Sequence, residues 1–552
     1  MRTSIATVSI SGTLAEKLTA IAAAGFDGVE IFENDLLASP MSPSEVRLRA
    51  ADLGLTIELY QPFRDFEAVP PDLLAANLRR AGHKFRLMER LGANLLLVCS
   101  NVSPAAIASD ELAADQLRQL ASLAGEHGIR IAYEALAWGR HVDDYLHSWR
   151  IVQQADHPAL GVCLDSFHIL SRGSDPIGIE AIPGEKIFFL QLADAPLLAM
   201  DVLQWSRHYR CFPGQGMFDL PDLVARVVRA GYTGPLSLEV FNDVFRQADA
   251  GRTARDGMRS LIALGDSSVP PQVVPTGFAF AELTADDRLR DLVRSLGFVS
   301  TDGQLWEQGD ARLVLRGNGD PALTAIGLEG PDPEESVRRA ESLLAPSEQN
   351  TITAPDGTRI TFCRPHEAPP ISGNITRIDH VALTQPWHHY DEAALFYRTV
   401  LALGPQQSLD VPDPYGLLRS RAMHASPVRI VLNVGVRWQH IALACDDLLA
   451  TARTLPPDLL LSIPPNYYDD LDARYDLDPE LRALGIMYDR DDHGEFLHLY
   501  TITVGRVFFE LVQRIGGYRG YGAVNAPVRL AAQHAREAQH AQHAREGNAP
   551  AQ

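Results

Sequence analysis

Short apolar runs alternate with amphipathic stretches through the first 240 residues of the chain. Each amphipathic stretch ends near a glycine, and an apolar run of strand length follows at once. Glycine adopts the left-handed conformation that ends many helices, and a continuous apolar run is typical of a strand covered on both faces. The pattern predicts eight strands, at Ser4–Ile10, Ala24–Glu30, Leu53–Tyr60, Leu91–Ser100, Gly128–Glu134, Leu160–Asp165, Lys186–Gln191 and Leu236–Glu239.

This alternation predicts an α/β fold, a (β/α)8 TIM barrel of parallel strands over residues 1–265. A doubly wound open sheet shows the same alternation of strands and helices, and the strand pattern does not separate the two architectures. Residues 266–275, DSSVPPQVVP, are rich in proline and small polar residues and are therefore predicted to be a linker.

A second pattern begins after this linker. GFAFAELT at Gly277–Thr284 is similar to RIDHVALT at Arg377–Thr384, about one hundred residues further on. This weak internal repeat predicts a duplicated α+β module. The predicted segments are one module copy at 276–345, a loop-rich connection at 346–376, a second copy at 377–530 and a low-complexity tail at 531–552 that forms at most a solvated helix.

Composition and charge narrow the classes of function. The net charge of -21 argues against a general nucleic-acid binder, because phosphate binding needs clustered cations. We find no run of eighteen apolar residues and no signal-peptide pattern, so we expect no membrane span. Five cysteines without a CxxC pair predict reduced thiols in a cytoplasmic protein. The sequence leaves open whether the chain forms a homo-oligomer.

Polar side chains end four consecutive predicted strands of the barrel. The carboxyl ends of barrel strands form the active face, so these side chains should meet at one centre. Three carboxylates and an amide oxygen make an all-oxygen site that suits Mg2+ or Mn2+. Unrelated polar residues facing solvent are the alternative. The four residues are Glu134, Asp165, Gln191 and Glu239.

The barrel sequence resembles the xylose-isomerase-like superfamily and, within it, bacterial 3-dehydroshikimate dehydratases fused to a dioxygenase-like domain. The stretches that carry the resemblance are SIATVSISG from Ser4, GVEIFEND from Gly28, QPFRDFE from Gln61, YEALAWGRH from Tyr133, LDSFH from Leu164 and RCFPGQG from Arg210. The resemblance implies that the four strand-end residues hold Mg2+, Mn2+ or Co2+. It also implies a lyase, a carbon-oxygen hydro-lyase that converts 3-dehydroshikimate to protocatechuate in quinate and shikimate catabolism.

The chemistry of this dehydration assigns roles to further residues. A divalent cation stabilises the enolate that forms when the proton alpha to the ketone leaves. His168, three residues past Asp165, is the candidate general acid or base, and a hydrogen bond to a metal ligand is its alternative role. Arg64 and Arg210 lie in predicted loops and could bind the substrate carboxylate or face solvent. Further candidates for pocket contacts are Ser206, His208, Glu30 and Glu33.

The C-terminal half resembles 4-hydroxyphenylpyruvate dioxygenases of the vicinal-oxygen-chelate fold. The stretches that carry this resemblance are IDHVAL from Ile378, QHIAL from Gln439 and FFELVQR from Phe508. It implies that His380, His440 and Glu510 form a facial triad for a second divalent metal, Fe2+ or Mg2+. The first copy carries Phe280 where the second carries His380, and His498 stands where the family tends to carry glutamine.

Several hypotheses for function stay open. The first is dehydration of a small-molecule substrate, 3-dehydroshikimate, in the barrel. The second is a sugar or cyclitol isomerase or epimerase on the same barrel. The third is a dioxygenase that acts on an aromatic keto acid through the C-terminal domain. The fourth is a non-enzymatic C-terminal half that serves dimerisation or ligand sensing.

Overall fold

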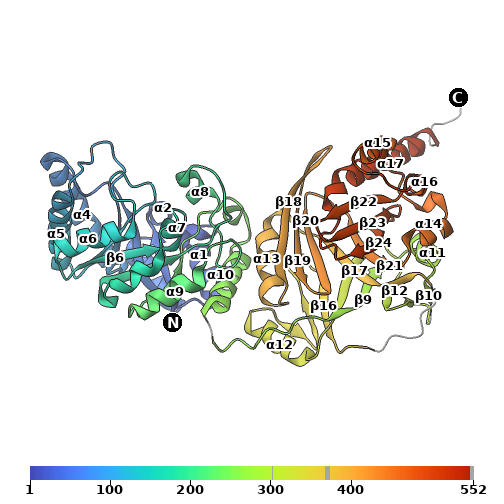
Figure 1. The fold of residues 1–552 in the computed structure, drawn as a ribbon. Coiled ribbons are helices and arrows are strands. Elements are labelled where there is room, and N and C mark those ends of the chain that lie inside the picture. The colour runs from blue at the N-terminus through green and yellow to red at the C-terminus, as the bar shows by residue number, and fades with distance from the viewer. Residues whose placement is uncertain (266, 301, 367–372, 548–552) are drawn as a thin grey trace. The chain divides into compact units, whose positions relative to one another are not determined.

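A computed structural model describes residues 1–265, 267–300, 302–366 and 373–547 of the chain. The chain divides into two compact units, Met1–Ser268 and Val269–Gln552. Three predicted segments extend beyond the described residues: the linker at Asp266, the connection at 367–372 and the tail at 548–552. Figure 1 draws the first unit in blue to green and the second in green to red.

The first unit is a closed barrel of eight parallel strands in sequence order, β1 to β8. This closure confirms the predicted (β/α)8 barrel and excludes the doubly wound open sheet. The strands are β1 (Thr3–Ala6), β2 (Gly28–Phe32), β3 (Thr56–Phe63), β4 (Leu95–Cys99), β5 (Arg130–Glu134), β6 (Leu160–Asp165), β7 (Ile187–Leu192) and β8 (Leu236–Leu238).

Helices follow the barrel strands, and local sequence signals set their ends. Thr13 and Glu16 form a capping box at the start of α1, and Ser42 and Glu45 form another at the start of α3. Gly92 ends α4 with φ at 77°, where a side chain would be strained. The helices are α1 (Leu14–Ala23), α2 (Glu33–Leu37), α3 (Pro43–Asp52), α4 (Pro71–Leu91), α5 (Asp110–Glu126), α6 (Tyr145–Ala155), α7 (Ser166–Leu170), α8 (Val202–His208), α9 (Leu220–Arg229) and α10 (Ala250–Gly265).

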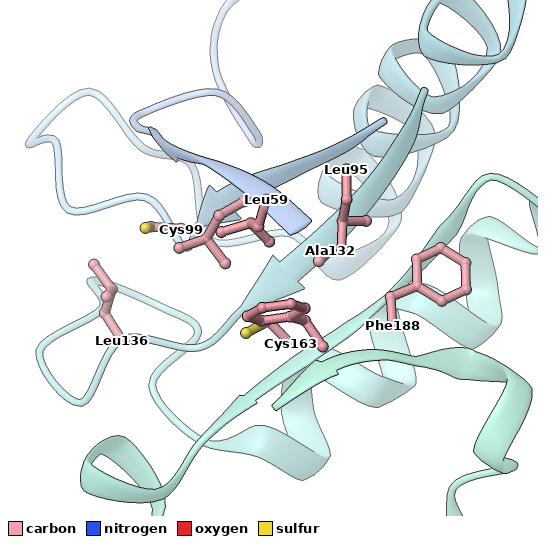
Figure 2. Close-up of a cluster of buried hydrophobic side chains, with 9 residues drawn as sticks. Leu59, Leu95, Cys99, Ala132, Leu136, Cys163 and Phe188 are labelled. Atoms are coloured by element: carbon pink, nitrogen blue, oxygen red, sulfur yellow. The ribbon is translucent and has the colours of Figure 1, made fainter. Parts of the chain in front are cut away.

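A cluster of buried, mostly apolar side chains lies along β3 to β7 of the barrel. Residues two apart on a strand share a face, so Leu97 and Cys99 lie on the same side of β4. Figure 2 shows the buried side chains that neighbouring strands contribute to this cluster. Cys99, at the end of β4, and Cys163, on β6, contribute two thiols to this cluster. The buried members are Leu59, Leu95, Leu97, Cys99, Ala132, Leu136, Cys163, Phe188 and Phe189.

The second unit contains two eight-stranded sheets with equivalent strand orders, β10-β11-β12-β9-β13-β16-β15-β14 and β18-β19-β20-β17-β21-β24-β23-β22. In each sheet the first long strand pairs parallel with one neighbour and antiparallel with the other. The order therefore agrees with a duplicated module. The central strands are β9 (Gly277–Thr284), β12 (Ala311–Arg316) and β13 (Ala322–Glu329) in the first sheet, and β17 (Ile375–Thr384), β20 (Val428–Val434), β21 (Gln439–Cys445) and β24 (Val507–Gly516) in the second.

The segment at 346–376, which was expected to be a loop-rich connection, contains three short strands that the sequence did not predict. Three strands of this segment complete the first sheet, and β16 pairs parallel with β13. They are only two to five residues long, so their alternation was too short to predict a strand. The strands are β14 (Ser347–Glu348), β15 (Thr351–Thr353) and β16 (Arg359–Cys363).

Helix α17 (Ala526–Gly547) begins before the predicted tail and is only partly solvated. Leu530 and Ala532 are buried, and Gln533 Nε2 donates to Thr503 Oγ1 at 3.2 Å. In the described residues no helix combines the length and apolarity needed to span a membrane. The remaining elements are β10 (Val299–Ser300), β11 (Leu305–Gln308), β18 (Gly404–Asp413), β19 (Gly416–Ala425), β22 (Met487–Asp491), β23 (Gly494–Tyr500), α11 (Asp287–Ser295), α12 (Pro333–Ser342), α13 (Tyr390–Thr399), α14 (Leu448–Thr454), α15 (Pro465–Arg474) and α16 (Glu480–Ala483).

Candidate functional site

The four predicted barrel ligands lie at the ends of neighbouring strands. Glu134 ends β5, Asp165 ends β6 and is in register with Gln191 on β7. Glu239 directly follows β8. All four side chains are at most 5% exposed. The parallel strands thus bring three carboxylates and one amide to the same end of the barrel.

One carboxylate oxygen at this end has no partner. Oxygen or nitrogen atoms of Glu134, Asp165 and His168 lie within 4.8 Å of one another. Among the described residues, no hydrogen-bond donor meets the buried Oε1 of Glu134. A buried carboxylate without a partner is costly, and a divalent cation would remove that cost. The residues present therefore fit a hard metal ion.

Like charges dominate this end of the barrel. Burial, and then the charges of Asp165 and Glu239, raise the pKa of Glu134 well above its usual value. Burial also raises the pKa of Glu239 to about 7, although Arg210 opposes the rise. Burial is the largest single effect on Asp165 and raises its pKa, but the charges of Arg210 and His168 and the hydrogen bonds from Arg210 and the main chain together lower the pKa below its usual value. The crowding of carboxylates favours a bound cation.

Two thiols hydrogen-bond to the candidate ligands. Cys99 Sγ donates to Glu134 Oε2 at 3.4 Å, and Cys163 Sγ donates to Gln191 Oε1 at 3.5 Å. Burial, more than any other effect, raises the pKa of both thiols well above the usual value. Both sulfurs therefore stay protonated and act as donors at this site.

Arg210 lies inside the carboxylate cluster rather than in an open loop. Its side chain is 1% exposed, and Nη1 donates to Asp165 Oδ2 at 2.8 Å and to Glu239 Oε2 at 3.0 Å. Nη2 donates to Ser206 Oγ at 2.9 Å. The guanidinium of Arg210 is thus engaged by protein groups, and Ser206 supports it. Their roles toward substrate stay predictions.

His168 is anchored against the same cluster. Asp165 caps α7, so that His168 follows on the first helical turn. The main-chain N–H of Ala137 donates to His168 Nδ1 at 3.1 Å, and Nε2 lies 3.7 Å from Asp165 Oδ2 and 3.2 Å from Arg210 Nη2. Burial lowers the pKa of His168 to about 3. The ring is therefore neutral near pH 7, with Nε2 on the side of the carboxylates.

Arg64, unlike Arg210, has a guanidinium group that is available to bind a ligand. It follows β3, is half-buried, and lowers the pKa of His168 after the larger effects of burial and Arg210. Within the described residues, its guanidinium has neither a hydrogen bond nor an ion pair. A substrate carboxylate is the type of group that such an arginine binds.

Several further polar residues differ in placement. Glu33 pairs with Lys84, and His208 Nδ1 lies 2.9 Å from Asp243 on the surface, so both are engaged away from the ligand cluster. Glu30 is fully buried in the barrel and accepts from Gln61 and Ser237. The sequence did not single out Gln61 or Ser237, although Gln61 lies near the carboxyl end of β3, as the four candidate ligands lie near the ends of their strands.

The second candidate centre lies in the second unit and joins β17, β21 and β24. Glu510 Oε2 lies 3.2 Å from His380 Nε2 and 3.3 Å from His440 Nε2. The two Nε2 atoms are 3.3 Å apart. Asp379 accepts from His380 Nδ1 at 2.9 Å, which turns Nε2 toward Glu510. Two imidazoles and a carboxylate on one side of a common point fit a divalent metal.

His498 holds the other oxygen of Glu510. Its Nδ1 lies 2.7 Å from Glu510 Oε1, and Asn525 Nδ2 donates to its Nε2 at 2.9 Å. Because the amide of Asn525 donates to Nε2, the neutral ring carries its proton on Nδ1 and donates it to Glu510. His498 is therefore committed to the protein and is not free for a ligand.

The cavity beside this triad is small. Arg529 on α17 lies over the rings of Tyr500 and Phe508, and it lines the cavity with Ala526. The inner cavity measures about 30 Å3, which is room for one or two water molecules. In the first sheet, Phe280 takes the position of His380, and its ring lies against Gly327.

Comparisons with known proteins agree with this architecture. The family described as xylose isomerase-like TIM barrel matches residues 18–264. The chain is 44% identical to the 3-dehydroshikimate dehydratase of Pseudomonas putida, over 96% of this chain and 98% of the relative. A solved xylose isomerase-like TIM barrel/4-hydroxyphenylpyruvate dioxygenase fusion protein is 42% identical, with a TM-score of 0.89 over 97% of this chain and 99% of its own. The 4-hydroxyphenylpyruvate dioxygenase of Pseudomonas aeruginosa is 27% identical over 45% of this chain and 90% of its own length.

Proposed function

Because the chain belongs to the family of 3-dehydroshikimate dehydratases, we propose that its barrel converts 3-dehydroshikimate to protocatechuate. The enzyme is a lyase that breaks a carbon-oxygen bond and releases one water molecule. The observation that carries the proposal is the unpartnered Oε1 of Glu134, beside Asp165 and His168 at the carboxyl ends of the strands. A site of this kind supports metal-assisted removal of an acidic proton.

We propose that Glu134, Asp165, Gln191 and Glu239 hold the metal ion, which is Mg2+, Mn2+ or Co2+. All four offer oxygen, which these hard ions prefer. When bound, the ion supplies Lewis-acid stabilisation of negative charge on the substrate ketone. The two thiols near the site stay protonated and serve as hydrogen-bond donors, so the ligand set remains oxygen.

The other groups bind the substrate and move its protons. Arg64 binds the carboxylate, because its guanidinium has no partner within the described part of the chain. His168 exchanges protons with the substrate through Nε2, which faces the carboxylate cluster. Arg210 keeps two candidate ligands in place. The substrate loses the proton alpha to its ketone and the hydroxyl at the beta carbon, and the ring becomes aromatic.

The test follows the aromatic product directly. The full chain is freed of metal with a chelator, reloaded with Mn2+ or Mg2+ and mixed with 3-dehydroshikimate. We expect ultraviolet absorbance of protocatechuate to appear only after reloading. Mass spectrometry separates this reaction from an isomerase or epimerase, whose product keeps the mass of the substrate. A product of unchanged mass from folded, metal-loaded protein contradicts the proposal.

We also propose a second divalent ion, Fe2+ or Mg2+, at His380, His440 and Glu510. The distances among these side chains and the support of His380 by Asp379 favour it. Metal analysis of the wild type and of His380→Ala tests the proposal. We expect the variant to lose one equivalent of metal while the dehydratase rate is kept. Equal metal content in both proteins contradicts the second site.

A dioxygenase of aromatic keto acids is the competing function for the second unit. The small inner cavity and the engagement of His498 argue against it, because an aromatic ring has no room beside the triad. Oxygen consumption by Fe2+-loaded protein with 4-hydroxyphenylpyruvate is the measurement. We expect none above the rate of His380→Ala.

We propose that the enzyme works in the cytoplasm on a small-molecule substrate. All five cysteines lie in the described residues and all are free thiols. Free thiols are typical of a reducing compartment. Cell fractionation followed by the dehydratase assay tests the location, and activity in an extracellular fraction contradicts it.

A further inference from the structure

The carboxylate of Glu30 is the centre of a buried network in the barrel. Glu30 lies on β2 and is 0% exposed. Three side chains from other strands donate to it. Gln61 Nε2 and Gln191 Nε2 each lie 2.7 Å from Glu30 Oε2, and Ser237 Oγ donates to Oε1.

This network fixes the amide of Gln191 in one of its two orientations. An amide has an acceptor oxygen on one side and a donor nitrogen on the other, and rotation by half a turn exchanges them. Oε2 of Glu30 accepts from two amides, so Nε2 of Gln191 must face β2. Oε1 of Gln191 then faces β6, where Cys163 Sγ donates to it. β6 is the strand that carries Asp165.

Only the oxygen of an amide binds a hard divalent cation. A Gln191 side chain turned by half a turn would present an NH2 group to the metal and lose this bond. We propose that Glu30 is a positioning residue for the dehydration, which holds the amide of Gln191 with Oε1 toward the metal ligands. The role rests on the proposed metal site, and metal binding is therefore measured apart from turnover.

The orientation of the Gln191 amide depends on an acceptor at the position of Glu30 Oε2 and not on charge. Glu30→Gln can keep it, since its amide oxygen can face Gln61 and Gln191 while its nitrogen donates to Ser237 Oγ. Glu30→Met has a similar length but offers no oxygen. If the site needs a carboxylate at position 30, both variants should lose Mn2+ affinity. If it needs only an acceptor, Glu30→Gln should keep the affinity and Glu30→Met should lose it.

A double-mutant cycle between Glu30→Met and Gln191→Glu tests the proposal. Both oxygens of a carboxylate can bind metal, so a glutamate at position 191 needs no orientation. All proteins carry His380→Ala, so that Mn2+ titrations by calorimetry report on the barrel. We expect Glu30→Met to weaken Mn2+ binding roughly 10-fold to 100-fold when residue 191 is glutamine. With glutamate at 191, we expect the same change to weaken it little or not at all.

Equal losses in both backgrounds would overturn the proposal, because they mean that residue 30 acts independently of the amide. An unchanged affinity of Glu30→Met overturns it as well. If the reference protein, which carries His380→Ala and keeps Glu30 and Gln191, does not bind Mn2+, then the proposed metal site itself fails. The dehydratase assay on the same proteins separates these two failures.

Glu30→Gln and Ser237→Ala provide a second cycle should Glu30→Met fail to fold. Each alone leaves an acceptor for Gln191, so each should keep Mn2+ affinity near the starting value. In the double variant, the side-chain nitrogen of the glutamine at position 30 has no acceptor at position 237. The amide at position 30 is then free to turn its nitrogen toward Gln191, which favours the turned orientation of the Gln191 amide as well. We expect the pair to lose affinity. A pair that binds Mn2+ as well as either single variant overturns the proposal.

Discussion

Arg210 Nη1 donates to Asp165 Oδ2 at 2.8 Å, so that a residue in the segment after β7 closes on a carboxylate at the end of β6. The same nitrogen lies 3.0 Å from Glu239 Oε2. Without metal, one guanidinium is thus the main positive charge between two carboxylates. Its removal should therefore affect the metal-free protein more than the metal-loaded one.

Arg210→Met should lower the stability of the metal-free protein by about 3 to 5 kcal/mol, because it leaves buried carboxylates without their cation. Mn2+ should then raise the melting temperature more in the variant than in the wild type. Scanning fluorimetry with and without Mn2+ measures both effects. Arg207→Met, at an exposed position of α8, is the matched control. Equal Mn2+ effects on the variant and the wild type would contradict this account.

Arg64→Gln should lower kcat/KM for 3-dehydroshikimate by about 10-fold to 100-fold, the value of a lost hydrogen bond to a charged group. Its Mn2+ affinity should stay the same or rise slightly, since Arg64 makes no hydrogen bond to a candidate ligand and its positive charge acts on Glu239 as a small effect. Steady-state kinetics and Mn2+ titration test the two parts. Arg79→Gln, exposed on α4, should leave both unchanged. An unaltered kcat/KM of Arg64→Gln means that the carboxylate is bound elsewhere.

Glu67 should make stability depend on pH. Burial raises its pKa to about 7 from 4.5, and its Oε2 has no donor among the described residues. A carboxyl group whose pKa is higher in the folded chain binds its proton more tightly there. It therefore stabilises the fold at low pH, and this contribution is lost as the pH rises from about 4.5 to about 7.

Glu67→Gln removes this titration and keeps an oxygen for Asn101 N and Tyr133 OH, which both donate to Glu67 Oε1. The stability of the variant relative to wild type should rise by up to about 3 kcal/mol across that range. Scanning fluorimetry of the two proteins at a series of pH values measures the trend. Glu126→Gln, exposed on α5, should show no trend. A flat difference for Glu67→Gln would refute the prediction.

His498→Phe should weaken metal binding in the second unit by about 10-fold to 100-fold, because Glu510 Oε1 loses its donor. The dehydratase rate should stay the same, since the barrel does not use this residue. Metal analysis after dialysis and the dehydratase assay test both statements. His493→Phe, at an exposed turn, is the control. Normal metal content in His498→Phe would show that Glu510 needs no such support.

The barrel and its ligand end could be predicted because their signals are local. Each strand is an apolar run next to a glycine turn, and each ligand ends such a run. The strands β14 to β16 could not be predicted in this way, because two to five residues are too few to show alternation. The pairing of β16 with β13 is a long-range contact that no short window contains.

The partners of the buried polar groups were also beyond the sequence. Arg210 is separated by 45 residues from Asp165, and Glu30 by 161 residues from Gln191. From the sequence, Arg210 is expected in a loop after a strand. Only the fold shows that its guanidinium points into the barrel and contacts Asp165 and Glu239. The resemblance to known families named the ligands but not the network that orients them.

The central claim is that the dehydration depends on a cation held at the strand ends of the barrel. The most direct measurement compares protocatechuate formation by Glu134→Gln and His380→Ala in full-length, Mn2+-loaded protein. We expect Glu134→Gln to lose nearly all of the rate and His380→Ala to retain it. A Glu134→Gln protein that forms protocatechuate at the wild-type rate would contradict the account.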